Sequence, residues 1–172
     1  GTATTLGQQL PVTRQAVAKH LVVLDRVGLV RASPSGRERR YCVDDAQLAQ
    51  DTRRIVEELS RLMGGLPYER YLFIVHLVDK RRGGLEHARS TTLNVHRMGF
   101  FPREAYEETL GLIAHEFFHL WNVKRLRPAA LVPYDYAREQ YTRLLWWFEG
   151  ATSYYEHVAL ARARIVDPKH WL

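Results

Sequence analysis

The stretch LGLIAHEFFHLWNVKR, residues 110–125, places two histidines four positions apart, with a glutamate beside the first, in a mostly apolar run. In a helix, positions i and i+4 share a face, so His115 and His119 can offer nitrogen lone pairs to one metal ion. Glu116 is rotated by about 100° around the helix, off the ligand face but beside the metal. This spacing is typical of zinc sites, in which the glutamate acts as a general base. We therefore expect a Zn²⁺ site on a helix, with Glu116 in the role of base.

Two histidines leave the zinc site in need of a third protein ligand, with a further position open for water. Glu149, in the run WWFEGATSYYE, is the best candidate. A carboxylate beside so many aromatic residues is costly to bury unless it is paired or bound to a metal. Glu156 and His157 are the alternative donors, and Glu156 follows Glu149 by seven residues, which places both toward the same side of a helix.

The motif GGLEH, residues 83–87, offers another carboxylate at the start of an expected strand. Gly83 and Gly84 permit close approach of a ligand backbone, and an edge strand here could bind a peptide by strand addition. Glu86 would then hold a free α-amino group. The alternative is a solvated glutamate at the end of a strand.

The patterns around these motifs predict mixed secondary structure in the second part of the chain. Residues 71–78 and 90–97 are expected strands separated by a turn. Residues 102–125 and 138–164 are expected helices, the first opened by a proline and the second interrupted by Gly150. The run MGGLP, residues 63–67, breaks the preceding helical pattern, and we place a domain boundary at 63/64.

Residues 1–63 have a different pattern. A short helix, a turn, a longer helix capped by Thr13, a two-stranded hairpin and a further helix together predict a winged helix-turn-helix. Such a module binds double-stranded DNA, with the second helix in the major groove and the hairpin against the backbone. The candidate contacts are Thr13, Arg14, Gln15, Lys19 and His20 in the helix and Arg37 and Arg39 in the hairpin. The alternative is that these are solvated charges on a small helical domain.

Composition sets outer limits on these interpretations. The 172 residues allow one ordinary domain or two small ones. The net charge is +6, with 10 Lys/Arg and 7 Asp/Glu in residues 1–63 and 15 and 12 in the remainder, so neither part is strongly basic. The chain has one cysteine and no apolar run of the roughly 18 residues that a membrane span needs, and we expect no signal peptide. We expect a cytoplasmic protein without a membrane partner.

The run LPVTRQAVAKHLVVLDRVGLVRASPSGRERRYCV, residues 10–43, resembles the ArsR-type winged-helix repressors of bacteria. The resemblance covers residues 3–62 and implies a DNA-binding role. The cysteine-rich motif of the metal-sensing members is absent, so no metal sensing is expected in this part. The first helix of the family, which helps to build the dimer, is also absent, so at most a weak homodimer is expected.

The motifs GGLEH, HEFFHLWNVKRLRPAAL and YTRLLWWFEGATSYY resemble the gluzincin metallopeptidases, most closely the glycyl aminopeptidases that carry a PDZ domain. The resemblance runs from about Tyr71 to the C-terminus and covers only the catalytic core of that family. It implies zinc on His115, His119 and Glu149, Glu116 as general base, and Glu86 near the free N-terminus of a peptide substrate. Tyr154 and Tyr155 are the candidates for stabilising an oxyanion.

Taken together, the sequence predicts an α+β protein. A winged helix-turn-helix at residues 1–63 precedes an incomplete thermolysin-like zinc-peptidase core at residues 64–172. The expected function is that of a zinc-dependent aminopeptidase core fused to a DNA-binding module. Two alternatives remain: a transcriptional regulator whose zinc-site half is not catalytic, and an inactive fusion of two gene fragments.

Overall fold

The computed structural model describes residues 2–8, 12–26, 30–43, 45–80, 82–100 and 102–170. The chain divides into two compact units, Gly1–Gln50 and Asp51–Leu172. The division therefore falls earlier than the expected boundary at 63/64. The reason is helix α3 (Asp45–Met63), most of which belongs to the second unit.

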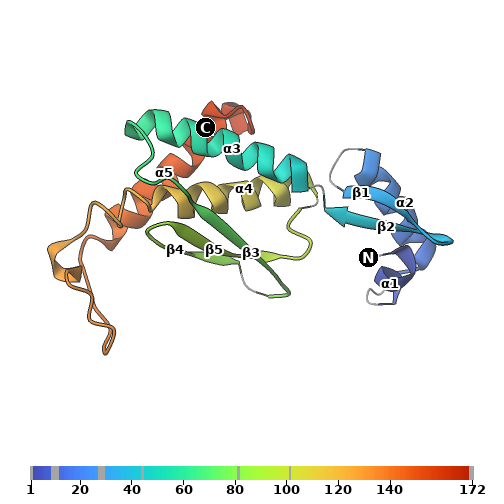
Figure 1. The fold of residues 1–172 in the computed structure, drawn as a ribbon, viewed down its shortest axis with the longest axis horizontal. Coiled ribbons are helices and arrows are strands. Elements are labelled where there is room, and N and C mark those ends of the chain that lie inside the picture. The colour runs from blue at the N-terminus through green and yellow to red at the C-terminus, as the bar shows by residue number, and fades with distance from the viewer. Residues whose placement is uncertain are drawn as a thin grey trace. The chain divides into compact units, whose positions relative to one another are not determined.

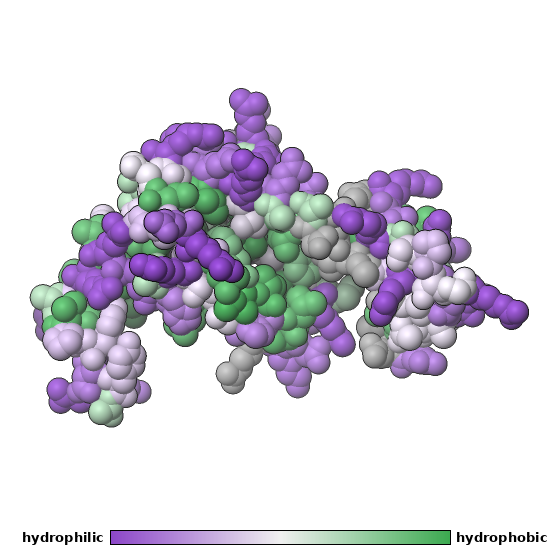
Figure 2. Space-filling view, in the orientation of Figure 1, coloured by the Kyte–Doolittle hydropathy of each residue, from purple (hydrophilic) through white to green (hydrophobic). Residues whose placement is uncertain are grey.

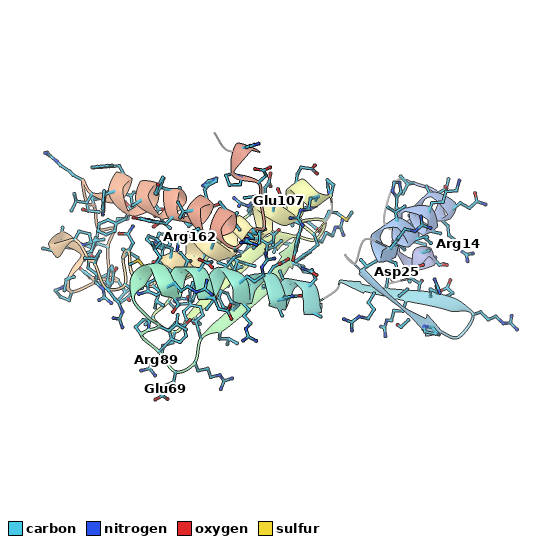
Figure 3. The ribbon with its side chains drawn as sticks, turned by 90° about the horizontal axis from the view of Figure 1, so that it is seen from above. Arg14, Asp25, Glu69, Arg89, Glu107 and Arg162 are labelled. Carbon is cyan, nitrogen blue, oxygen red and sulfur yellow. The ribbon has the colours of Figure 1, made fainter. Side chains whose placement is uncertain are left out.

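Helix α3 joins the second unit through both apolar and polar contacts. Ile55 and Leu59, one turn apart, are completely buried. Asp51 is also buried, and its Oδ2 accepts a hydrogen bond of 2.9 Å from the hydroxyl of Tyr106. Further along, the Arg162 side chain, labelled in Figure 3, reaches from α5 to Glu58 of α3 at 3.3 Å. The sequence pattern identified this helix but assigned it to the first domain, whereas from Asp51 onward it belongs to the second unit.

The first unit contains α1 (Ala3–Gly7), α2 (Arg14–Arg26) and a hairpin of β1 (Val30–Ser35) with β2 (Glu38–Val43). This is the order of elements expected from the sequence. Thr13 caps α2, because its Oγ1 accepts a hydrogen bond from the Ala16 amide at 3.2 Å. Asp25, labelled in Figure 3, ties the end of α2 to the hairpin by accepting from the Ala32 amide at 2.9 Å.

The second unit contains a three-stranded sheet of β3 (Leu72–Val78), β4 (Gly83–Glu86) and β5 (Ser90–His96), in the order β3-β5-β4. β3 runs parallel to β5, and β4 runs antiparallel to β5 at the other edge. The residues of the GGLE motif thus form an edge strand. On β3, three apolar residues remain exposed: Leu72, Ile74 and Leu77. Figure 2 shows apolar surface in the region where Figure 1 labels the strands of this sheet.

Helix α4 packs on the sheet, a second helix packs on α4, and these two helices carry the chemistry-bearing motifs. α4 (Arg103–Phe118) contacts β4, β5 and α5 (Leu145–Arg162), as Figure 1 shows. α4 is apolar on most sides and is buried accordingly, with Leu110, Ile113 and Phe117 in the centre of the core. A helix in this position holds its side chains rigidly, which suits it to carry a site.

Both helices are shorter than the sequence predicted. α4 ends at Phe118 rather than Arg125, because the amides of Leu120 and Trp121 bond to carbonyls three residues back, which tightens the chain into turns. α5 begins at Leu145 rather than Arg138, and Gly150 lies within it without interrupting it. None of the described helices combines the length and the apolar character needed to cross a bilayer.

Candidate metal centre

Three side chains from α4 and α5 converge on one point. The Nε2 atom of His115 lies 3.3 Å from Oε2 of Glu149, and the Nε2 atom of His119 lies 3.9 Å from the same oxygen. The two imidazole rings stand nearly perpendicular, with centroids 4.8 Å apart. His119 sits at the C-cap of α4 with helical backbone angles, so the i, i+4 relation to His115 is kept although the helix proper ends one residue earlier.

The other nitrogen of each ring has a partner of its own. Nδ1 of His115 lies 3.1 Å from Oε2 of Glu156, and Nδ1 of His119 lies 3.2 Å from the carbonyl oxygen of Asn122. Both partners are acceptors, so a proton on Nδ1 of each ring would satisfy them and leave the Nε2 lone pair for a cation at the shared point. This tautomer is the one that presents two Nε2 donors to a single cation.

The alternatives left open for the third ligand lie elsewhere. Glu156 contacts the far nitrogen of His115 rather than the shared point. His157 lies with its Nδ1 2.6 Å from the Ser153 carbonyl, one turn back along α5. Among the described residues, Glu149 is the one that joins both histidines in a compact group of donor atoms, all within 4.8 Å of one another.

This donor set fits a zinc ion. Two imidazole nitrogens and one carboxylate oxygen are the ligands of many catalytic zinc sites, which keep one position open. With metal–ligand bonds of about 2.0–2.2 Å, a tetrahedral site separates its donor atoms by about 3.4 Å. The separations from Glu149 to His115 and His119, 3.3 and 3.9 Å, are close to that spacing.

Glu116 lies beside the group, buried between α4 and the edge strand β4. A Cβ atom built on Gly84 would stand 2.3 Å from Cδ and 2.5 Å from Oε1 of Glu116. The sequence suggested that the glycines of the motif make room for a ligand backbone. For Gly84 the structure shows a different neighbour, the carboxyl group of Glu116. Gly83 begins the same strand and has open space around it.

Glu86, at the end of β4, forms an ion pair with Lys124 in the turns after α4, with 3.0 Å between Oε1 and Nζ. Both side chains are largely buried. Glu86 also has donor oxygens close to Glu116 and His119, which extends the site toward the edge strand. The solvated glutamate considered as an alternative from the sequence therefore does not describe this side chain.

The crowding of carboxylates and imidazoles alters their proton affinities. Burial raises the pKa of Glu116 to about 7, and the neighbouring carboxylates add to the effect against the opposing influence of His115. Burial lowers the pKa of His119. Burial alone would lower the pKa of His115 too, but the hydrogen bond to Glu156 and the other carboxylates outweigh it, so the pKa is raised. For Glu86, burial is outweighed by hydrogen bonds, including that from Lys124, and the pKa is lowered.

The two tyrosines proposed for an oxyanion differ in their surroundings. Tyr154 is exposed, and its ring lies edge-on to Tyr155 with centroids 5.2 Å apart. Tyr155 stacks on Phe118 at 4.8 Å. Within the described residues, no hydrogen bond connects either hydroxyl to the histidine and glutamate cluster.

Several residues of the site escaped the sequence analysis. Asn122, buried, donates to the Phe148 carbonyl at 3.0 Å and to the Thr152 hydroxyl at 3.1 Å, which fixes the turn carrying its own carbonyl near His119. Lys124 is the partner of Glu86. The only signal in the sequence was their closeness to HEFFH, which does not distinguish them from the neighbouring residues.

The candidate DNA contacts of the first unit lie on its surface. Arg14, Gln15, Lys19 and His20 are exposed on α2, and Figure 3 shows Arg14 projecting from that helix. Arg37 in the hairpin turn and Arg39 on β2 are exposed as well. Thr13, also exposed, has its hydroxyl engaged as the helix cap.

Comparisons with known proteins show likenesses to peptidases. Residues 108–172 match the sequence model of the M61 glycyl aminopeptidases. A solved structure, the aminopeptidase N family protein from Idiomarina loihiensis, is 31% identical with a TM-score of 0.70 over 83% of this chain. The chain spans about a quarter, 26%, of the length of that protein. The comparison with curated proteins found no match.

The two likenesses cover different parts of the chain. The family match lies wholly within the second unit, and both likenesses are to aminopeptidases, which supports a peptidase-like second unit in a mixed α+β fold. The second unit, Asp51–Leu172, makes up 122 of the 172 residues, or 71%, so the structural match over 83% of the chain includes residues of the first unit as well. The family match does not reach the winged-helix candidate.

Proposed function

We propose that the second unit is the core of a zinc-dependent aminopeptidase, with His115, His119 and Glu149 as the metal ligands. The observation that carries this proposal is the meeting of three donor atoms from two helices, with both Nδ1 atoms held by acceptors. Bound zinc would supply Lewis-acid polarisation of the scissile carbonyl and acidify the attacking water. The remaining chemistry belongs to side chains of this protein.

Glu116 is the proposed general base. Its buried carboxyl group has a pKa near 7, so at neutral pH it can accept a proton from water and return it to the leaving amine. Gly84 lets this carboxyl group lie directly against the edge strand, where an extended peptide would bind. The proton is therefore exchanged next to the backbone of the substrate rather than in bulk water.

Glu86 is the proposed anchor for the α-ammonium of a substrate with a free N-terminus. Its lowered pKa keeps it charged, and its place at the end of β4 puts it in line with a strand-bound peptide. Lys124 already contacts this carboxylate, so a substrate ammonium would share Glu86 with Lys124 or displace it. The roles of Tyr154 and Tyr155 toward an oxyanion stay predictions.

Metal analysis of the purified chain tests this function directly. Wild type should contain about one zinc per molecule, and His115→Ala and Glu149→Ala should each lose it, because zinc holds poorly to two protein ligands. Glu69→Ala, which removes an exposed glutamate outside the group (Figure 3), is the matched control and should keep full zinc content. Equal zinc content in all four proteins would refute the site.

We propose a second function, DNA binding, for the first unit. Two observations favour it: the order of α1, α2 and the β1–β2 hairpin, and the exposed Arg14, Gln15 and Lys19 along the first turns of α2. The first turn of a recognition helix is where base contacts are made in helix-turn-helix proteins. The proposed partners of the first unit are double-stranded DNA and, weakly, a second copy of the same chain. A cytoplasmic location remains an expectation.

A further inference from the structure

We propose that Glu156 is a positioning residue for His115, and that position 111 is a glycine because the Glu156 carboxylate occupies the space that a side chain would fill. This inference rests on the proposed metal site and names the means by which one of its ligands is aimed.

Two contacts of a single carboxylate carry the inference. Oε2 of Glu156 lies 3.1 Å from Nδ1 of His115. Oε1 of the same group lies 2.5 Å from the point where a Cβ of Gly111 would stand. Gly111 precedes His115 by four residues, so both face the same side of α4, toward α5. The Glu156 side chain is only 16% exposed, so the carboxylate crosses the helix interface rather than reaching through solvent.

The hydrogen bond has a defined consequence for the ring. A carboxylate that accepts the Nδ1 proton fixes the tautomer and the ring orientation, and so points the Nε2 lone pair at the position between His119 and Glu149. His119 is held differently, by the backbone carbonyl of Asn122. Because His119 has this separate acceptor, a substitution of Glu156 should change the orientation of His115 and leave that of His119 in place.

Glycine in the middle of a helix destabilises it relative to alanine, so its use in α4 needs a reason. An alanine at position 111 would meet the flexible end of Glu156 rather than fixed backbone. The cheapest response is for Glu156 to swing away while the helix stays intact. Gly111→Ala should therefore break the contact with His115 without unfolding the protein.

A double-mutant cycle on zinc affinity tests the inference in the full chain. Zinc is competed against a chromophoric chelator for wild type, Gly111→Ala, Glu156→Ala and the double variant. Each single change should weaken zinc binding by about 10–100-fold, the usual cost of losing an outer partner of a ligating histidine. The double variant should lose no more than either single one, because without the carboxylate the added methyl group meets nothing.

Gly150→Ala is the matched control. It also replaces a glycine inside a helix of the site, but a Cβ at that position has no atom within 4 Å. It should leave zinc affinity unchanged. Cobalt(II) substitution gives a second readout, because the visible absorption of the ion reports its ligand geometry. The spectrum should change in Glu156→Ala and Gly111→Ala and not in Gly150→Ala.

The outcomes separate this inference from the proposed function. If wild type binds zinc and Glu156→Ala binds it equally well, the positioning role is overturned while the metal site stands. Losses that add in the double variant would overturn the link between Gly111 and Glu156. Absence of zinc in wild type would overturn both proposals. Should Glu156→Ala fail to fold, Glu156→Met, which roughly keeps the length of the side chain and removes both acceptor oxygens, decides by the same two readouts.

Discussion

The candidate functional residues of the two units differ in their exposure to solvent. In the first unit, Arg14, Gln15 and Arg37 are exposed along a helix and a hairpin turn. In the second unit, Glu116 and His119 are buried under apolar helices. Exposed charges cost little and are common on any surface, so by themselves they say little about function. Buried ones are costly unless each has a partner, and here hydrogen bonds and ion pairs surround them.

This difference means that the second unit supports a sharper functional proposal than the first. Removing one polar group from a buried cluster leaves its partners unsatisfied, so single substitutions there should have large effects. An exposed arginine contributes binding free energy only when a partner is bound, and even then the loss of one arginine should weaken the affinity only slightly.

The largest effect is expected for Glu116→Gln. The amide cannot serve as a base, so hydrolysis of glycyl p-nitroanilide should fall by about 10²–10⁴-fold, the usual contribution of general acid–base catalysis. Zinc content should remain at the wild-type level, because Glu116 is not one of the three proposed ligands, and its own group of donor atoms, with Glu86 and His119, contains only one of them. Loss of zinc in this variant, or turnover at the wild-type rate, would remove Glu116 from the role of base.

A smaller but still large loss is expected for Gly84→Ala. The added methyl group would overlap the carboxyl group of Glu116, which must then move. Displacing a catalytic group by about 1 Å can cost about 10²-fold in rate. Zinc content should be unchanged, and Gly83→Ala is not a clean control because its backbone has a positive φ of 156°. Gly150→Ala serves instead, and an equal rate loss there would contradict the contact as the cause.

Some residues of this site could be predicted from the sequence and others could not. The helical spacing of His115 and His119 followed from local periodicity. Glu149 was predicted from the cost of burying a carboxylate among aromatic residues, but that premise was wrong, because its side chain is 53% exposed. Glu156, seven residues further on, was the alternative on the same side of the helix. What separated them was the side of His115 that each contacts, and only the packing of α5 on α4 determines that.

The roles of the glycines and the limits of the elements required the tertiary structure. Gly84 and Gly111 are each explained by a carboxyl group from another element, more than 30 residues away in the chain. Sequence periodicity placed the end of α4 at Arg125, because apolar residues continue past Phe118, but the chain there forms turns. Likewise, the glycines after Met63 marked the end of α3 and not the edge of a compact unit.

A third prediction concerns the boundary between the units. Tyr106→Phe removes the hydroxyl that donates to Asp51 and should lower the free energy of unfolding by about 1–3 kcal/mol, since the acceptor is a buried carboxylate. Chemical denaturation followed by circular dichroism measures this. Tyr136→Phe, at a ring that is 96% exposed, is the control and should be neutral. Equal stability of both variants would mean that this contact does not help to anchor α3.

The smallest effects are expected in the first unit. If Arg14 and Arg37 each neutralise one phosphate, then the slope of log affinity against log salt should decrease in magnitude by about 0.9 for each arginine replaced by alanine. Affinity itself should fall only a few-fold at low salt. Titration of a fluorescent duplex with the full chain at several salt concentrations gives both quantities.

Arg53→Ala provides the comparison that makes the DNA prediction decisive. Arg53 carries the same charge and is 80% exposed, but it lies on α3 in the second unit and pairs with Glu57. Its loss should leave the slope unchanged, because it lies outside the proposed interface. If Arg53→Ala lowers the slope as much as Arg14→Ala does, binding reflects the net positive charge of the chain rather than a surface built by α2 and the hairpin. If wild type does not bind duplex DNA even at low salt, the exposed arginines are solvated charges and the first unit has no such role.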